Sequence, residues 1–442
     1  MNQLNVPYEW PEPERRPVTM ISPSAPRVML LGYNGANNTG AEALLLADIE
    51  DVRAVFGPQA VITIPCINPP NLRRYIRETP NLRIAPIPTI FFAALRRLVR
   101  ENDLVMLVEG STYMDTWTSA MLWAYLWATY WADAMGKPCL AYAVDAGEIK
   151  RALNRRLVRS EASKTSLIVT RAAAAAERLR AWGITAPIEV TADNAFTFVP
   201  DPADAGLFDR LWPGAGNRVM GLALVDFYLF PVVMRPWGPK EECYKWPYYF
   251  ARTPERYRGS EELASSYATI ADHLVGEHGV SVALICMEEL DERIARKVHA
   301  RMRYSDRARI FSSREYNASR MVSILRSLDF LVTSRYHACV LSLAAQVPQI
   351  AVGHDLRLKS IYAELGLADL FVDARDPGRD AALQANLDRV LAEPEPVQLA
   401  LRQGYEDHLD KARNNRQLLR QFALERGWAT ALGAPIAQPV AA

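Results

Sequence analysis

The sequence predicts an α/β fold of two domains whose parallel sheets face a cleft. The chain has 442 residues, which is too long for one hydrophobic core. From Arg27 onward, short apolar runs alternate with amphipathic segments, and this alternation is typical of strand–helix units in a parallel sheet. The run 199–217 is rich in Pro, Gly and Asp, so it divides the chain into halves of similar size.

The first domain is expected over residues 27–200. It follows a proline-rich leader, residues 1–26, which lacks the charged start and apolar core of a signal peptide and is expected to be disordered. Two helices that end in glycine are expected over 41–57 and 172–183. The strands are expected at 27–33, 60–66, 103–110, 138–147, 166–171 and 188–198.

Residues 116–136 form an apolar run whose length is near the lower limit for a membrane-spanning helix, so length alone does not distinguish such a span from a buried core helix. Trp123, Trp127 and Trp131 recur every four residues and would line one helical face. We favour a helix buried against the sheet, with docking on a membrane as the minor alternative.

The second domain is expected over residues 218–392, and a charged amphipathic helical segment, 393–430, is expected to pack across both halves. An aromatic, proline-bearing segment, 226–260, has no clear period and is interpreted as a long loop over the cleft. The other expected elements are strands at 218–225, 280–287, 330–334 and 348–352, and helices at 261–278, 289–303 and 337–346.

The composition excludes several classes of partner. Lys and Arg number 51 against 50 Asp and Glu, so there is no overall basic field to hold nucleic acid. A local anion site is still allowed. The five cysteines lie far apart and form no CxxC pair, which argues against a disulfide framework or a structural metal and favours a reducing cytoplasm.

The first strand ends in GYNGANNTGAE, residues 32–42. This segment fails the GxGxxG spacing, and no GKS or GKT follows, so neither a dinucleotide fingerprint nor a Walker loop is supported. Gly35 and Gly40 would let the backbone approach a ligand, while Asn38 and Glu42 could bind sugar hydroxyls. The alternative is a simple turn that caps the next helix.

Two other strand ends carry candidate residues. In VEGSTYMD, residues 108–115, Gly110 and Ser111 follow the strand, and Glu109 with Asp115 would form an acid/base pair only if their side chains converged. YAVDAGE, residues 142–148, is a weaker site of the same kind. Arg171 closes another strand, where its guanidinium would suit a carboxylate or phosphate. The alternatives are an ordinary turn and a surface ion pair.

The strongest candidate is TSRYHACVLSLAAQVPQIAV, residues 333–352. Ser334, Arg335 and His337 lie in a turn between an apolar strand and a helix, and Arg335 and His337 would share one side if the extended form persisted. A cation beside a titratable imidazole at a helix start suits phosphate binding with proton transfer. Alternatively, His337 is a capping or core histidine. His354 and Asp355 repeat the arrangement and could line the same rim.

These motifs, in order from about residue 28 to 370, resemble the polysaccharide pyruvyl transferase family. The family's GYxGxxNxGDE signature is similar to residues 32–42, with Ala41 in place of aspartate. Its TADxAF signature is similar to residues 191–196, and its late serine–arginine–histidine motif is similar to 334–338.

The resemblance implies two Rossmann-like domains of the GT-B kind with the active site between them. It implies that phosphoenolpyruvate donates a pyruvyl group to a sugar of a cell-envelope or exopolysaccharide glycan, with no metal and no cofactor. Arg335 and His337 would hold and protonate the donor, and Arg171 would be a second anion clamp. The substrate-binding set would also include Ser334, Asn38, Gly40, Glu42, Gly110 and Ser111.

The expected partners are phosphoenolpyruvate and a sugar or lipid-linked glycan acceptor, and nucleic acid is not among them. Peripheral membrane contact stays as the minor alternative for residues 116–136. Two alternatives stay open. One is a GT-B glycosyltransferase that uses a nucleotide sugar. The other is a non-catalytic sugar-binding relative, suggested by Ala41 and by the alanines at 172–176.

Overall fold

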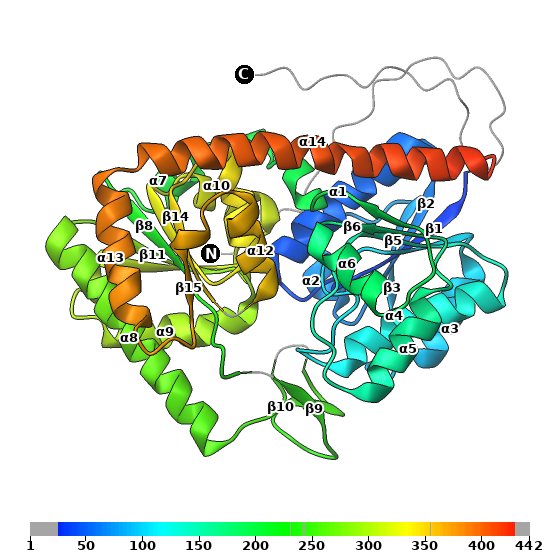
Figure 1. Cartoon of the computed structure of the whole chain (residues 1–442), viewed down its shortest axis with the longest axis horizontal. Helices are drawn as coiled ribbons and strands as arrows, with labels where there is room; N and C mark the ends of the chain where they lie inside the picture. Colours follow the sequence, from blue (N-terminus) through cyan, green and yellow to red (C-terminus); the bar gives the residue numbers. More distant parts are fainter. Residues whose placement is uncertain (1–24, 230, 242–243, 354, 429–442) are drawn as a thin grey trace.

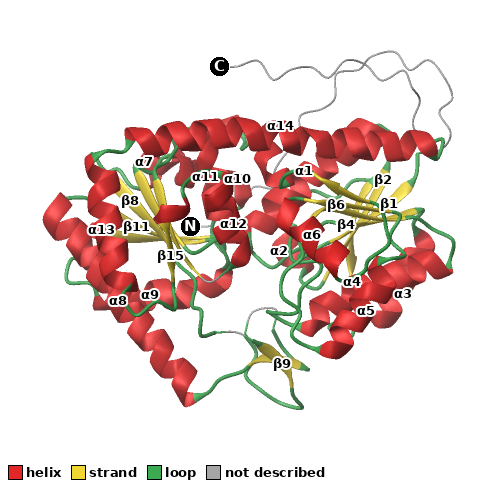
Figure 2. Ribbon diagram, in the orientation of Figure 1, coloured by secondary structure: helices red, strands yellow, loops and turns green. Residues whose placement is uncertain are grey.

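A computed structural model of the chain describes residues 25–229, 231–241, 244–353 and 355–428 (Figure 1). Most of the expected leader therefore lies outside the described residues. Two parallel sheets, each covered by helices, form the two halves of the molecule (Figure 2). The predicted α/β class with two facing domains is confirmed.

The first sheet has the strand order β3-β2-β1-β4-β5-β6-β7. Its strands are β1 (Arg27–Leu31), β2 (Val61–Cys66), β3 (Leu82–Pro86), β4 (Leu104–Leu107), β5 (Cys139–Val144), β6 (Leu167–Thr170) and β7 (Ile188–Val190). Its helices are α1 (Thr39–Phe56), α2 (Pro69–Leu72), α3 (Phe92–Glu101), α4 (Ser119–Ala134), α5 (Ala152–Ala162) and α6 (Ala173–Ala181).

The second sheet has the order β12-β11-β8-β13-β14-β15. Its strands are β8 (Val219–Ala223), β11 (Ser281–Cys286), β12 (Ala308–Ser312), β13 (Phe330–Thr333), β14 (Gln349–Gly353) and β15 (Phe371–Asp373). The helices of this half are α7 (Leu207–Leu211), α8 (Pro254–His278), α9 (Glu292–Arg301), α10 (Ala318–Arg326), α11 (Tyr336–Ser342), α12 (Leu356–Glu364) and α13 (Arg379–Ala392).

Both sheets repeat one topology. Counted within its own domain, each has the order 3-2-1-4-5-6, which is the Rossmann order, and the first adds a seventh strand at one edge. The chain direction across the sheet reverses between β1 and β4 and between β8 and β13. The carboxyl ends of these strands are the expected ligand positions. Ser334 and Arg335 connect β13 to α11, so the candidate motif at residues 333–352 lies at such a point.

Sheets covered on both faces need strands that are apolar throughout. All four residues of β4 and of β13 are buried, and the core continues into the helices on either side. In α4 the indole nitrogen of Trp127 donates to the Phe92 carbonyl at 2.8 Å, and that of Trp123 donates to Asn154 at 2.9 Å. The expected buried helix is confirmed. Within the described part of the chain, no helix is both long and apolar enough to cross a bilayer.

Three expectations need correction. The expected strand 188–198 ends at Val190, because the Asp193 side chain accepts from the Ala195 N–H and starts a 3-10 turn. The expected loop 226–260 contains an antiparallel hairpin of β9 (Val232–Met234) and β10 (Tyr248–Phe250). Its end is already helical, since Thr253 caps α8 and Pro254 is its first residue.

Two segments tie the domains together beyond the connection at 199–218. The last helix, α14 (Glu395–Glu425), runs along both halves, as predicted (Figure 1). On the first domain Arg416 pairs with Asp51 at 2.6 Å, while α14 also packs on residues 343–345 of the second. The β9–β10 hairpin reaches the first domain at the other edge, where the Val232 N–H donates to the Trp117 carbonyl at 2.9 Å.

Candidate active site

A cavity of about 390 Å³ lies between the two domains, where the carboxyl ends of both sheets meet. Among the predicted site residues, those that line the cavity are His337, Arg335, Arg171, Ser334, Asn38, Gly40 and Ser111. Glu42 and Gly110 do not line it.

Arg171 follows β6 and is enclosed by two carboxylates. Its Nε lies 3.1 Å from Asp145, it forms an ion pair with Asp193, and its side chain is 0% exposed. Burial is the largest single influence on Asp193 and raises its pKa, but the charge of Arg171, the nearby His337 and the Ala195 N–H together outweigh burial and hold that pKa well below the usual range. The Nη2 atom of Arg171 has no hydrogen-bond partner among the described residues, so one donor remains for a ligand.

Two neighbours fix the position of the Arg171 guanidinium. It stacks on the ring of Tyr336, with 4.3 Å between the guanidinium carbon and the ring centroid. Gly110 passes on another side, and a Cβ there would collide with the guanidinium. Gly110 therefore makes room for Arg171 and does not itself line the cavity.

His337 lies in the first turn of α11 and points into the other domain. Its Nε2 is 3.5 Å from the Asp193 carboxylate. A Cβ at position 40, in the first turn of α1, would collide with the His337 ring. The close approach of the imidazole therefore requires glycine at this position. Asp193 thus contacts both Arg171 and His337, and can orient the histidine ring.

Arg335 is the N-cap of α11 and turns toward its own domain. It forms ion pairs with Asp291 and, at 3.1 Å, with Glu288. Because the helix begins at Tyr336, the extended form does not persist, and Arg335 and His337 have partners on different elements. Burial raises the pKa of Asp291 to about 6 despite the charge of Arg335.

Glu288 connects the second cluster to the first domain. Its carboxylate accepts from the Tyr33 hydroxyl at 3.1 Å and from the Asn38 amide at 3.4 Å. Asn38 also caps α1, since its Oδ1 accepts from the Ala41 N–H at 3.1 Å. Asn38 therefore combines the capping role with a place on the cavity wall.

Glu42 occupies a different place from the one predicted. It is buried between the domains and accepts from the Ala318 N–H, at the start of α10, at 2.8 Å. Burial raises its pKa to about 8. Glu42 caps a helix of the second domain and does not reach the cavity.

The acid/base pair considered at the end of β4 does not form. Glu109 accepts from the Ser111 hydroxyl at 3.1 Å, whereas Asp115 accepts from the Lys150 N–H at 2.7 Å and lies off the cavity wall. On the second domain, the Ser334 hydroxyl lies 3.3 Å from that of Tyr267. Asp355 lines the cavity and pairs with Arg357, while His354 lies outside the described residues.

Several residues of the site had no predicted role. The aspartates had weak signals, since Asp193 lies in the TAD segment and Asp145 in YAVDAGE. For the partners of Arg335 and for the cavity arginine Arg357 there was no signal in the sequence. The residues in question are Asp145, Asp193, Glu288, Asp291, Tyr336 and Arg357.

Solved structures with the same architecture share little sequence with the chain. Anabaena HepE in complex with UDP-glucose has a TM-score of 0.54 at 12% identity, covering 90% of this chain and 100% of that chain. The structure of S. aureus MnaA with UDP has a TM-score of 0.58 at 9% identity, covering 91% of this chain and 96% of that chain. Sucrose-phosphate synthase from Thermosynechococcus elongatus has a TM-score of 0.56 at 15% identity, covering 90% of this chain and 100% of that chain. These likenesses establish the GT-B fold alone.

Comparison with curated proteins by sequence finds no match. The family model for polysaccharide pyruvyl transferase, in contrast, matches residues 38–355. That match runs from the cap of α1 to the cap of α12, and it includes both arginine clusters and His337. The chain belongs to the polysaccharide pyruvyl transferase family.

Proposed function

We propose that this chain transfers the pyruvyl group of phosphoenolpyruvate to a sugar of a cell-envelope or exopolysaccharide glycan, forming a ketal. The observation that carries the proposal is that Arg171 of one domain and His337 of the other both line the cavity and share the buried Asp193 behind it. An anion-binding group and a proton donor therefore stand together where the two domains meet. Family membership supports the same reaction class.

The reaction needs one acid and a place for two anionic groups. In our proposal His337 donates a proton to the methylene carbon of the donor, and a sugar hydroxyl oxygen bonds to the neighbouring carbon. Phosphate then leaves with the C–O bond electrons, and a second hydroxyl closes the ketal. Of the two hydroxyl protons, one replaces the proton given by His337 and the other goes to phosphate.

Cations around the cavity would hold the donor's carboxylate and phosphate. Arg171 offers its unpaired Nη2, and Arg335 lines the cavity with its side chain 13% exposed. Arg357 lines it too. Each arginine is already paired with a carboxylate, so it is held in place before the donor arrives.

The acceptor is proposed to enter from the hairpin side. Phe227 and Tyr244 of the segment around the hairpin line the cavity, and Ser111 and Glu109 face them from the first domain. Aromatic faces and carboxylates are common sugar-binding groups. Trp237, at the hairpin end, is 78% exposed, which would suit contact with a lipid-linked acceptor at a membrane surface. The described cysteines are free thiols, in keeping with a cytoplasmic location.

The test is phosphate release by the purified full-length protein from phosphoenolpyruvate, with a panel of nucleotide-linked and lipid-linked sugars. We expect release only with a matching acceptor, whose mass should increase by one pyruvyl ketal. Thermal stabilisation by a nucleotide sugar, with none by phosphoenolpyruvate, would instead indicate a glycosyltransferase. No response to either would indicate a non-catalytic sugar-binding protein.

A further inference from the structure

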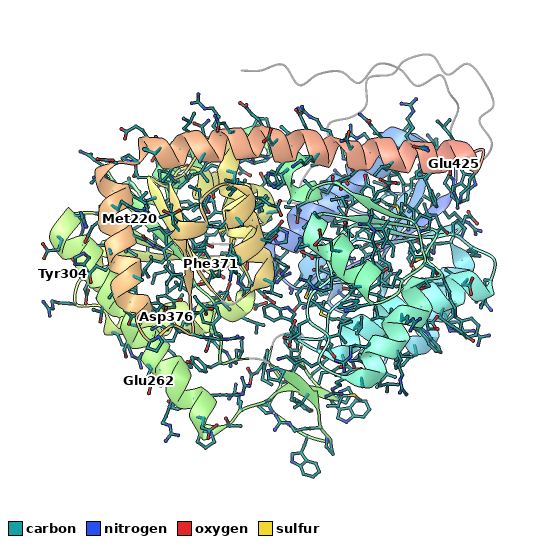
Figure 3. All side chains as sticks on the ribbon, viewed as in Figure 1. Met220, Glu262, Tyr304, Phe371, Asp376 and Glu425 are labelled. Atoms are coloured by element: carbon teal, nitrogen blue, oxygen red, sulfur yellow. The ribbon has the colours of Figure 1, made fainter. Side chains whose placement is uncertain are left out.

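A cluster of three potential metal ligands lies on the second domain, away from the cavity. His273 and His278 stand in the last turns of α8, and Asp388 stands on the neighbouring helix α13. Tyr304, labelled in Figure 3, packs against Gly276 at the same end of α8. The cluster therefore lies at the outer edge of this domain, and its three residues are absent from the cavity lining.

The distances in the cluster are close to those of a metal site. The Nε2 atoms of His273 and His278 lie 3.6 and 3.5 Å from one oxygen of Asp388. In a tetrahedral zinc site with bonds near 2.0–2.1 Å, neighbouring ligand atoms are ~3.4 Å apart. One ligand atom of each residue lies within 4.8 Å of the others, so a small rotation of side chains would complete the geometry.

One ligand atom lacks a partner. The Nε2 of His278 is buried and has no hydrogen bond among the described residues. A buried polar nitrogen without a partner is costly unless something else satisfies it. A metal ion in contact with Asp388 would satisfy it, and Asp388, with its side chain 55% exposed, leaves the site open to an ion from solvent.

A neighbouring amide can orient the other histidine. Gln384 stands one turn before Asp388 on α13, and its side-chain nitrogen lies 3.2 Å from both ring nitrogens of His273, so a small turn of the ring would leave it beside Nδ1 alone. With the amide turned over, its oxygen would accept the Nδ1–H, which is how metal-bound histidines are commonly held. Nε2 would then face the metal.

We propose that His273, His278 and Asp388 bind a divalent transition-metal ion of the zinc type, with water at the remaining position. Two imidazoles and one carboxylate favour such an ion over Mg²⁺ or Ca²⁺, which prefer oxygen ligands. The ion would tie α13 to the end of α8. This differs from the expectation of no metal, which rested on cysteine spacing. The helical separation of the histidines and the remote aspartate form no recognisable sequence motif.

The test begins with metal-free full-length protein titrated with Co²⁺, whose visible absorption reports tetrahedral coordination, followed by displacement with Zn²⁺. We expect one site of this kind. Affinity should fall at least ~10-fold in His278→Ala and in Asp388→Asn, since each removes one ligand. His299→Ala is the matched control, because it removes a histidine from α9 in the same domain and should leave the affinity unchanged.

Thermal unfolding gives a second readout, which is independent of catalysis. Zn²⁺ should raise the unfolding temperature of the wild type and of His299→Ala, and should leave that of His278→Ala unchanged. Without metal, the three proteins should unfold at similar temperatures, which checks that the variants fold. Equal metal affinity in all variants would overturn the proposal, as would binding that requires millimolar metal.

Discussion

The two domains each place a buried arginine between two carboxylates at the ends of their strands, yet the two clusters differ in exposure. Arg171, with Asp145 and Asp193, has a side chain that is 0% exposed, whereas that of Arg335, with Glu288 and Asp291, is 13% exposed. In each cluster one carboxylate also contacts the opposite domain. The same charge arrangement thus anchors structure in the first domain and presents an arginine edge to the cavity in the second.

The largest expected effect comes from removing the enclosed arginine. Arg171→Met should lower the free energy of unfolding by ~3–5 kcal/mol, because it leaves two buried carboxylates without a cation. Arg335→Met should cost less, roughly 1–3 kcal/mol, since water can reach this cluster. Urea denaturation followed by tryptophan fluorescence compares them. Equal losses would show that the difference in exposure has no energetic meaning.

Acid should reduce the gap between wild type and Arg171→Met. The pKa of Asp193 is lower in the folded protein than in the unfolded chain, because Arg171, His337 and the Ala195 N–H together outweigh the effect of burial, and Arg171 is the largest of the three. A lowered pKa contributes stability above the unfolded value of about 4, and this contribution is lost as the pH falls below it. Repeating the denaturation between pH 7 and pH 3 measures the change. A gap that widens in acid would contradict the ion pair.

The next effect concerns the residue where the first cluster meets the second domain. His337→Gln should reduce turnover ~10²–10⁴-fold, as expected for the loss of a general acid, while thermal stabilisation by phosphoenolpyruvate remains. Arg335→Ala should abolish that stabilisation. Phosphate release and thermal shift, measured on both variants, separate the roles. Normal turnover in both would place the active site elsewhere.

A smaller effect tests how closely the domains approach. In Gly40→Ala the new Cβ would displace the His337 ring, and overpacking of this kind costs ~1–3 kcal/mol. Turnover should fall along with stability. Gly214→Ala is the control, because its Cβ would meet no atom within 4 Å, and it should change stability by less than ~0.5 kcal/mol. Normal activity in Gly40→Ala would mean that the histidine works in another position.

The last expected effect concerns Glu42, the third carboxylate that crosses between domains. Its pKa of about 8 is raised by burial above that of the unfolded chain, so the protein loses stability as the pH rises from about 4.5 to 8. Glu42→Gln keeps an acceptor for the Ala318 N–H and removes the titration. Its unfolding temperature should therefore fall less than that of the wild type between pH 5 and pH 9. Parallel curves would show that Glu42 is not protonated in the fold.

Burial explains which elements the sequence revealed. Strands such as β8 and β13 are continuous apolar runs because helices cover both faces, and they were predicted within a few residues. Two elements were not predicted: α3, whose arginines give it a polar face, and β15, which has only three residues. Short or half-exposed elements gain their stability from the domain around them, so their own sequences carry little signal.

The site was partly predictable for a geometric reason. Residues that follow the carboxyl ends of parallel strands lie at the edge of the sheet where ligands bind, so Arg171, after β6, and Arg335 and His337, after β13, could be selected from position alone. Their partners could not, because Asp193 and Glu288 are brought near by the packing of one domain on the other. Glycines give an ambiguous signal for a related reason. A glycine that makes room for a protein side chain, as Gly110 does for Arg171, looks the same in the sequence as one that makes room for a ligand.

The return of α14 to the first domain determines how the molecule can open. The connection at 199–218 starts from a turn that packs on α14, and the β9–β10 hairpin lies at the opposite edge (Figure 1). The helix α14 thus lies on the side where a hinge between the two domains would be, and the hairpin lies on the side that would open. A rotation of one domain against the other about α14 would separate Val232 from Trp117 and His337 from Asp193, while the contacts of α14 with both domains would be preserved. Substrate and product would then pass by the hairpin edge.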